Sequence, residues 1–470
     1  MKKLIYITFT MMLFFTFACE DLVDDINDNP NKLAIEEIDP SLFLKGAMLA
    51  DVQVQLGHLN RISNMWSGQL VGFQSLYKAL YEYNFTAAES EATWEIGYQG
   101  ALNQLRFIQE VTTDDPIYQG ISKVVEAHVM GTLASIFGDI PYTEATQEDI
   151  QDPKFDDQAQ VFAELQSLLD EAITNLENVE GNPQLEPDIF YGGNPELWIE
   201  SAWTLKARYY LLTKQYGEAF NAAQNGISTP ENSMRYIPVD DNNPDNKNLI
   251  FKLLNGARTG DIGTGNSFVM QLLDSGSVNS RNHAKTNEEA RKAYLTIEES
   301  NASLVGYGGR LEPMPLITYA ENQLILAESA ARTQGLNEGL DYLNGLRNAL
   351  EQGEVFEQLS DTLNLLYEPF VAADFASGGI ENPDGIAANR AFLREVIEER
   401  YISGFGQYIP FNDARRLRKS DQDIAIPIPL NIGSASSFPE RFVYANTELN
   451  SNSNAPDPAP DIYEVTPVNQ

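Results

Sequence analysis

The residues of this chain that usually carry out catalysis are sparse and poorly arranged for it. The three histidines, His58, His128 and His283, lie far apart and form neither an HExxH motif nor a pair four residues apart. Residues 274–277 lack the first glycine of a nucleophile elbow, and no lysine follows the glycine-rich run 260–265. We therefore predict no catalytic residue and no cofactor, and we interpret the chain as a binding protein rather than an enzyme.

The sequence contains no strong pattern of metal-ligating residues either. The segment 240–246, DDNNPDN, offers oxygen ligands of the kind that calcium prefers, but it lacks the ligand spacing of an EF-hand. We interpret this segment as a turn-rich polar loop and assign no metal site to it. Whether the chain binds calcium stays an open question. His128 stands among apolar residues at helical spacing, which favours a hydrogen-bonded histidine in the core over a metal ligand.

Aromatic side chains are the remaining candidates for chemistry, because their faces stack on sugar rings and their polar neighbours read hydroxyl groups. Between residues 64 and 85 six aromatic residues alternate with Asn and Gln. Phe73 and Tyr77 are four residues apart, as expected of residues that pack one face of a helix. We predict a ligand-binding role for three residues of this stretch, Trp66, Tyr81 and Tyr83, and for the loop residue Tyr307.

The N-terminus predicts export and a lipid anchor. Lys2 and Lys3 precede an apolar run over residues 4–18, which is too short to span a bilayer and is typical of a signal peptide. It ends in Ala18 and Cys19, the only cysteine, an arrangement typical of bacterial lipoproteins acylated on that cysteine. We predict cleavage after residue 18, a lipid on Cys19 and an acidic tether over 19–40.

The net charge of the chain restricts the classes of partner that it can bind. The formal charge is −37, which repels phosphate backbones and anionic lipid headgroups. We therefore expect no nucleic-acid partner, and we expect the membrane attachment to come from the lipid on Cys19.

The segments that must position these side chains are mostly helical by periodicity. Apolar residues recur at helical spacing through much of 41–228 and again from 315 onward, whereas Asn, Asp, Gly and Ser dominate between. We predict a mainly α fold: a tetratricopeptide-like helical part over 41–228, a loop-rich lobe over 229–314, and C-terminal helices with an extended, surface-wrapping tail over 315–470.

Five blocks, in this order along the chain, together resemble the SusD/RagB family of outer-membrane nutrient-binding lipoproteins, and look closest to its SusD-like subgroup. They are Cys19 with residues 27–31 (NDNPN); 137–145 (FGDIPYTEA) with 153–158; 188–193 (DIFYGG) with Trp198 and 205–208; 315–321 (PLITYAE) with 326–328; and 397–401 (IEERY) with 412–416 and 439–444.

This resemblance implies a function. Such a protein faces outward from the outer membrane, sits as a lid on a SusC-like TonB-dependent transporter, and hands it an oligosaccharide. An oligopeptide ligand, as for RagB-like members, is the nearest alternative. A glycan-degrading lipoprotein and a lid with little affinity of its own are the more distant ones.

Overall fold

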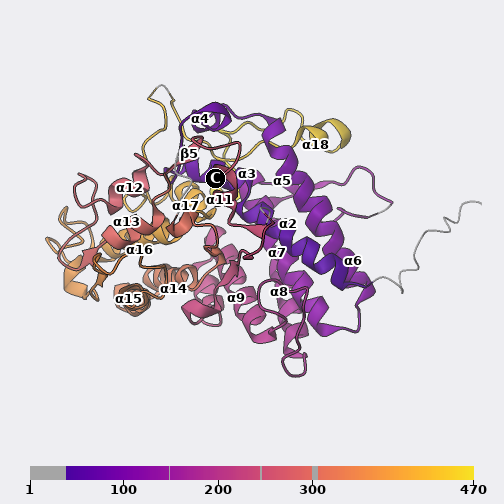
Figure 1. The fold of residues 1–470 in the computed structure, drawn as a ribbon, viewed down its shortest axis with the longest axis horizontal. Helices are drawn as coiled ribbons and strands as arrows, with labels where there is room; N and C mark the ends of the chain where they lie inside the picture. The colour runs from indigo at the N-terminus through magenta and orange to yellow at the C-terminus, as the bar shows by residue number, and fades with distance from the viewer. Residues whose placement is uncertain (1–38, 148, 244–245, 299–304, 434) are drawn as a thin grey trace, which may run out of the picture. The chain divides into compact units, whose positions relative to one another are not determined.

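Apolar stretches with helical periodicity form the long helices of the computed structural model (Figure 1). The structure describes residues 39–147, 149–243, 246–298, 305–433 and 435–470, so Cys19 and the predicted signal and tether up to residue 38 lie outside the described residues. Within these ranges the helices of nine or more residues are α2 (Ser41–Leu56), α3 (His58–Trp66), α6 (Asn103–Val111), α7 (Pro116–Phe137), α8 (Gln158–Glu177), α9 (Pro195–Leu212), α14 (Tyr319–Thr333), α15 (Leu336–Glu351), α16 (Ala388–Ser403) and α17 (Ile409–Leu417).

Shorter helices lie between them. They are α4 (Ser75–Tyr81), α5 (Glu91–Glu95), α10 (Tyr216–Ala223), α11 (Leu249–Leu254), α12 (Phe268–Leu273), α13 (Glu289–Leu295) and α18 (Asn446–Ser451), with the 3₁₀ turns η2 (Ala87–Ser90), η4 (Pro230–Asn232), η6 (Gly306–Gly308), η7 (Ala372–Phe375) and η8 (Pro467–Asn469), and the π-helical turn η3 (Ile96–Leu102).

Capping residues fix where the long helices begin. The side chain of Asp115 accepts hydrogen bonds from the first turn of α7, and Asn194 does the same for α9; each is followed by proline at the first helical position. Thr318 caps α14 through the backbone N–H of Glu321. These caps satisfy N–H groups that have no partner within their own helix.

The helices pack as consecutive pairs, and the pairs pack on one another. α7 packs on α8, α8 on α9, α9 on α10, and α10 on α14, which in turn contacts α15 and α16. This confirms the predicted fold class, a mainly α protein with a tetratricopeptide-like scaffold. No helix of the described residues is long and apolar enough to cross a membrane.

Strands are short, and most of their pairs join segments that are distant in sequence. In the part of the chain that the structure describes, the strands are β1 (Val71–Gly72), β2 (Ile140–Pro141), β3 (Phe155–Asp156), β4 (Met234–Tyr236), β5 (Ile262–Gly263), β6 (Thr286–Asn287), β7 (Met314–Ile317) and β8 (Leu366–Tyr367). They form four antiparallel pairs: β1 with β5, β2 with β3, β4 with β7, and β6 with β8. Three of these pairs tie the region 229–314 to the helical segments before and after it. The predicted domain boundaries themselves stay a prediction.

Two networks of buried ion pairs hold the helices around α16. The central network consists of Glu328, Arg400, Asp413 and Arg416; Arg416 lies 2.6 Å from Glu328 and 2.9 Å from Asp413, and Arg400 lies 2.9 Å from Asp413. The lateral network consists of Arg281, Glu288, Arg291, Glu395 and Glu399, with nitrogen–oxygen distances of 2.6 to 3.2 Å. Each network therefore joins α16 to a segment distant in sequence.

Glu328 is the carboxylate on which the central network depends. Burial alone opposes its charge, but the neighbouring Arg416, Arg332 and Arg400 outweigh burial and lower the pKa of Glu328 to about 2. Since an unfolded glutamate has a pKa of about 4.3, the stabilisation from this charge is complete above that pH and disappears as the pH falls toward the folded value.

We predict that Glu328→Gln lowers the free energy of unfolding by about 3 to 5 kcal/mol at pH 7, because it leaves buried arginines without their carboxylate. The deficit relative to the parent shrinks as the pH is lowered below about 4.3. Urea denaturation between pH 7 and pH 3 measures both effects. Glu164→Gln on the exposed face of α8 is the matched control and changes stability by less than about 0.5 kcal/mol. A deficit of equal size at every pH contradicts the assignment.

Candidate functional site

The aromatic stretch around α3 and α4 lies mainly in the core. Trp66 is 2% exposed, its ring stacks on Phe442 at 4.8 Å between centroids, and its indole N–H donates to the carbonyl oxygen of Leu80. Tyr83 is 5% exposed, and its hydroxyl oxygen accepts a hydrogen bond from the backbone N–H of Asn431. In this structure neither ring offers a face to a ligand, because C-terminal segments cover both. Tyr81 is half-buried and keeps part of its ring at the surface.

The other polar motifs also have structural roles in the described residues. His128 is buried with Nδ1 2.9 Å from Oδ2 of Asp51, which confirms a hydrogen-bonded core histidine. In the loop that offered calcium ligands, Nζ of Lys247 lies 2.8 Å from Asp241 and lowers the pKa of that carboxyl to about 2. Among the described residues no three His, Cys, Asp or Glu side chains are grouped to hold a metal ion.

A cavity of about 320 Å³, which we call the cleft, is lined by aromatic and charged side chains. A hollow of about 480 Å³ on α8 and α9 is lined by uncharged side chains. The volume of the cleft fits a small organic ligand. The walls of the cleft come from β4, α13, η6, β7, the start of α14, the segment after α15 and the end of α16. Its charged, aromatic and hydroxyl-bearing lining residues include Arg235, Arg291, Tyr294, Tyr307, Glu312, Tyr319, Glu354, Phe356, Glu357, Ser403 and Phe405.

Aromatic rings form much of the wall of the cleft. Tyr294 packs against Phe356 with 5.5 Å between ring centroids, and Tyr307 meets Phe405 edge to face at 4.9 Å. Tyr319 follows the cap of α14 and is only half-buried, so it is the tyrosine of this set with the most accessible ring. The cleft thus combines fixed rings at its base with one accessible ring at its side.

The charges of the cleft are mixed. Arg235 on β4 donates from Nη2 to the carbonyl oxygen of Pro230 at 2.9 Å and forms no ion pair among the described residues. Glu312 accepts a 2.7 Å hydrogen bond from the hydroxyl of Tyr294, and Glu354 and Glu357 are exposed. Arg291 is already engaged in the lateral network. The cleft therefore offers one cation and three carboxylates to a ligand.

Burial raises the pKa of Glu312, and the charge of Glu357 adds to this effect, whereas the Tyr294 hydrogen bond and the charge of Arg235 oppose it. An acid held in this way accepts a proton at a higher pH in the folded chain than in the unfolded chain. The folded state is therefore penalised at neutral pH, and the penalty disappears as the pH falls.

Of the four ligand residues predicted from the sequence, the structure brings only Tyr307 to the cleft, with its side chain 3% exposed. The remaining lining residues come from segments spread between 230 and 405. Those of the block 315–321 were recognised in the sequence as part of the scaffold and not as ligand contacts, and the pairing of β4 with β7 places Arg235 beside Pro315. The cleft is a product of the tertiary structure.

Comparison with known proteins gives one clear family. The family model described as starch-binding, associating with the outer membrane, and called SusD-like, matches residues 30–408. No curated protein sequence matches the chain.

Solved structures share the fold. A SusD/RagB family protein from Bacteroides thetaiotaomicron is similar with a TM-score of 0.65 and 18% identity, covering 89% of this chain and 95% of its own. A SusD homologue from Bacteroides fragilis has a TM-score of 0.64 and 19% identity, covering 92% of this chain and 100% of its own. A chitin-binding SusD homologue from Flavobacterium johnsoniae has a TM-score of 0.64 and 16% identity, covering 87% and 94%.

We predict that Glu312→Gln removes a pH-dependent penalty. The parent is expected to be less stable than the variant at pH 8 and to gain stability relative to it as the pH falls through the raised pKa of Glu312 toward about 4.3. Urea denaturation of both proteins between pH 8 and pH 4 measures the difference. A difference in stability between parent and variant that does not change with pH contradicts a raised pKa of Glu312.

Proposed function

Because the chain belongs to the SusD-like family of starch-binding proteins that associate with the outer membrane, we propose that it captures an oligosaccharide in the cleft and delivers it to a SusC-like TonB-dependent transporter. The observation that carries this proposal is the aromatic wall of the cleft, with the accessible ring of Tyr319 beside polar and charged groups. Rings of this kind stack on the apolar faces of sugars, and the polar groups fix the orientation of the ligand.

The proposed binding mode assigns a role to each wall. Tyr319 and Phe356 supply contact area for a sugar ring, while Arg235, Glu312 and Ser403 supply donors and acceptors for its hydroxyl groups. Tyr294 holds Glu312 through its hydroxyl, so the acceptor is already oriented before a ligand arrives. Of the aromatic residues predicted from the sequence, Tyr81 offers a competing surface on α4, which the experiment below separates from the cleft.

The proposed location is the outer face of the outer membrane, with the lipid on Cys19 as the anchor. The family description supports association with that membrane. The net charge of −37 makes a nonspecific hold on anionic lipid unfavourable, so a covalent lipid is the attachment that fits the composition. In this proposal the protein sits as a lid on the transporter and performs no chemistry on its ligand.

We predict that purified protein binds one class of polysaccharide on a glycan array that includes starch fragments and, because one structural relative is described as chitin-binding, chitin fragments. Tyr319→Ala is expected to weaken that binding at least about tenfold, since the lost ring contact corresponds to about 1.4 kcal/mol or more. Isothermal titration with the glycan that binds gives the ratio.

Two further variants make this experiment decisive. Tyr463→Ala removes a tyrosine that is 42% exposed outside the cleft, and it is the matched control, expected to leave the affinity unchanged. Tyr81→Ala tests the competing surface. Loss of affinity in Tyr81→Ala with full binding by Tyr319→Ala contradicts the cleft as the site, and binding of no glycan at all contradicts the oligosaccharide proposal.

An oligopeptide is the second candidate ligand, and the mixed charges of the cleft favour it specifically. A short peptide carries a carboxylate and an ammonium group, for which Arg235 and the three glutamates are complementary partners. A neutral sugar would use Arg235 and Glu312 only as a hydrogen-bond donor and acceptor, and not as counter-charges. The two ligand classes therefore make different demands on Arg235.

If peptides bind, we predict that Arg235→Gln weakens binding of peptides with a free C-terminal carboxylate about tenfold or more and leaves C-terminally amidated peptides of the same sequence unaffected. Isothermal titration of parent and variant with each matched peptide pair measures this selectivity. Equal weakening of both peptides contradicts a carboxylate contact at Arg235, and binding of glycans alone removes the peptide candidate.

A further inference from the structure

The hollow of about 480 Å³ on α8 and α9, which we call the outer hollow, is a second concave surface with aromatic side chains. Within the described part of the chain, it shares no lining residue with the cleft. One wall is a face of α8, on which residues three and four positions apart lie above one another. The other wall is the end of α9. The side chains that define the outer hollow are Phe162, Ala163 and Gln166 from α8, and Tyr209, Tyr210 and Thr213 from the end of α9.

Two buried rings form the base of the outer hollow. Phe162 and Tyr209 are 2% and 1% exposed, and their ring centroids lie 5.4 Å apart. The Tyr209 hydroxyl donates to the carbonyl oxygen of Ala127 at 2.6 Å, which fixes the ring. The neighbouring Tyr210 is only half-buried, so part of its ring is accessible. The outer hollow therefore combines a fixed aromatic base with one accessible ring.

The two walls are held together before any ligand arrives. Nε2 of Gln166 on α8 donates to the carbonyl oxygen of Lys206 on α9 at 3.0 Å. Nζ of Lys206 donates in return to the carbonyl oxygen of Gln166 at 3.2 Å. A surface that is fixed in this way loses little conformational entropy when a ligand binds.

Polar groups at the rim of the outer hollow are accessible to a ligand. The Tyr210 hydroxyl forms no hydrogen bond among the described residues. Burial and the charges of Asp170 and Glu218 raise the pKa of Tyr210, so this hydroxyl stays protonated and can donate. Gln215, which also lines the outer hollow, is exposed, and its Nε2 donates to Oγ1 of Thr213 at 2.9 Å. Its amide oxygen thus provides an acceptor beside the tyrosine.

The lining of the outer hollow carries no formal charge. As far as the structure describes them, none of its side chains is Asp, Glu, Lys, Arg or His, although the chain has 68 acidic and 31 basic residues. Asp170 acts on Tyr210 from outside the lining and is paired with Lys206 at 2.6 Å. A charged ligand therefore meets no counter-charge in the lining, whereas a neutral ligand with apolar faces and hydroxyl groups matches it.

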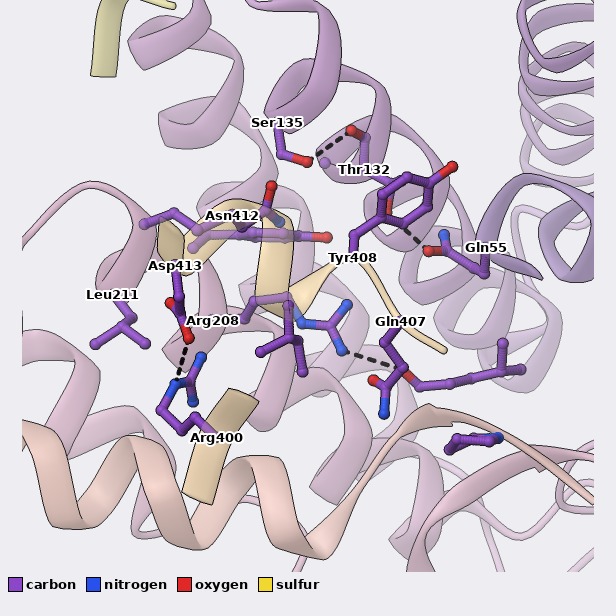
Figure 2. A pocket seen from close by; sticks show the side chains of 16 residues that line it. Gln55, Thr132, Ser135, Arg208, Leu211, Arg400, Gln407, Tyr408, Asn412 and Asp413 are labelled. Atoms are coloured by element: carbon purple, nitrogen blue, oxygen red, sulfur yellow. Dashed lines mark hydrogen bonds and ion pairs between the residues drawn. The ribbon is translucent and has the colours of Figure 1, made fainter. Parts of the chain in front are cut away.

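The small cavity in Figure 2 shows the contrast. It lies where α7, α9 and α17 meet, and its volume is about 30 Å³, which suits water-sized species. Its lining includes Arg208, Arg400 and Asp413, all of them in ion pairs. Arg400 lies 2.9 Å from Asp413, and Arg208 lies 2.6 Å from Glu321. Of these two hollows, the outer one has the size and the neutral lining that a sugar needs.

We propose that the outer hollow is a second carbohydrate site, which binds a neutral polysaccharide chain. One sugar ring lies on the accessible face of Tyr210, and its hydroxyl groups exchange hydrogen bonds with the Tyr210 hydroxyl and the Gln215 amide. This site does not depend on which ligand the cleft takes. Where the cleft also takes a glycan, two sites on one protein retain a long polymer better than one site does, because the second contact is made at a raised effective concentration.

Native electrophoresis through gels that contain a polysaccharide tests this site apart from the cleft. The polymers are amylopectin, a neutral glucan, and fully N-acetylated glycol chitin. We expect at least one of them to retard the Tyr319→Ala protein, because the outer hollow still binds it. Adding Ala163→Glu, which places a carboxylate in the lining, is expected to raise the dissociation constant at least about tenfold. Gln160→Glu in the same background adds one negative charge at an exposed position on α8 outside the lining, and it keeps the retardation.

Tyr210→Ala is the second variant and removes the accessible ring, with the same expected loss. Tyr463→Ala, which removes a tyrosine that is 42% exposed outside the lining, is its matched control. An unchanged melting temperature shows that each variant is folded, and Ala163→Glu decides the question if Tyr210→Ala does not fold.

Several outcomes overturn the proposal. They are retardation that Ala163→Glu leaves unchanged, no retardation of the Tyr319→Ala protein by either polymer, and a dimer in size-exclusion chromatography that Ala163→Glu dissociates, since a second copy then covers the outer hollow. Loss of all retardation by Tyr319→Ala alone supports the cleft and overturns the second site. Loss caused by Ala163→Glu in the parent, with Tyr319→Ala unaffected, supports the outer hollow and contradicts the cleft.

Discussion

The constraint on which the structure depends is the need to neutralise charge inside a helical core. Glu328 and Arg416 are fully buried. Arg416 pairs with Glu328 and Asp413, and Glu328 pairs with Arg416 and with Arg332. A buried charge left without its partner is strongly destabilising, so α14, α16 and α17 must come together in one register for the chain to fold. Arg208 and Glu321 repeat the arrangement between α9 and α14, at a distance of 2.6 Å.

The same constraint places the walls of the cleft. α14 carries Tyr319 at its start, Glu321 in its first turn and Glu328 further along, so the ion pairs that fix the helix also fix the aromatic ring. α16 carries Glu399 and Arg400 in the two networks and leads directly into the cleft at Ser403 and Phe405. Residues that hold the scaffold and residues that face the ligand are therefore neighbours on the same rigid elements, which suits a binding site that must be formed in advance.

The sequence was sufficient for the fold and insufficient for the site. Helical periodicity and the blocks around 205–208, 315–321 and 412–416 predicted the scaffold, and the structure shows why these blocks are recognisable: they supply the arginines and carboxylates that meet in the core. The concentration of aromatic residues at 64–85 was a poor guide to the surface, because Phe442, more than 350 residues later, covers Trp66. Proximity in sequence does not report which rings a distant segment will bury, and of the four predicted ligand residues only Tyr307 lies at the cleft.

The most direct test of the central claim is a crystal structure of the protein in complex with the glycan or peptide that binds it most tightly. The account predicts ligand density in the cleft, in contact with the ring of Tyr319 and with the polar groups of Arg235 or Glu312. Density at the Tyr81 surface, with the cleft unchanged, would contradict it.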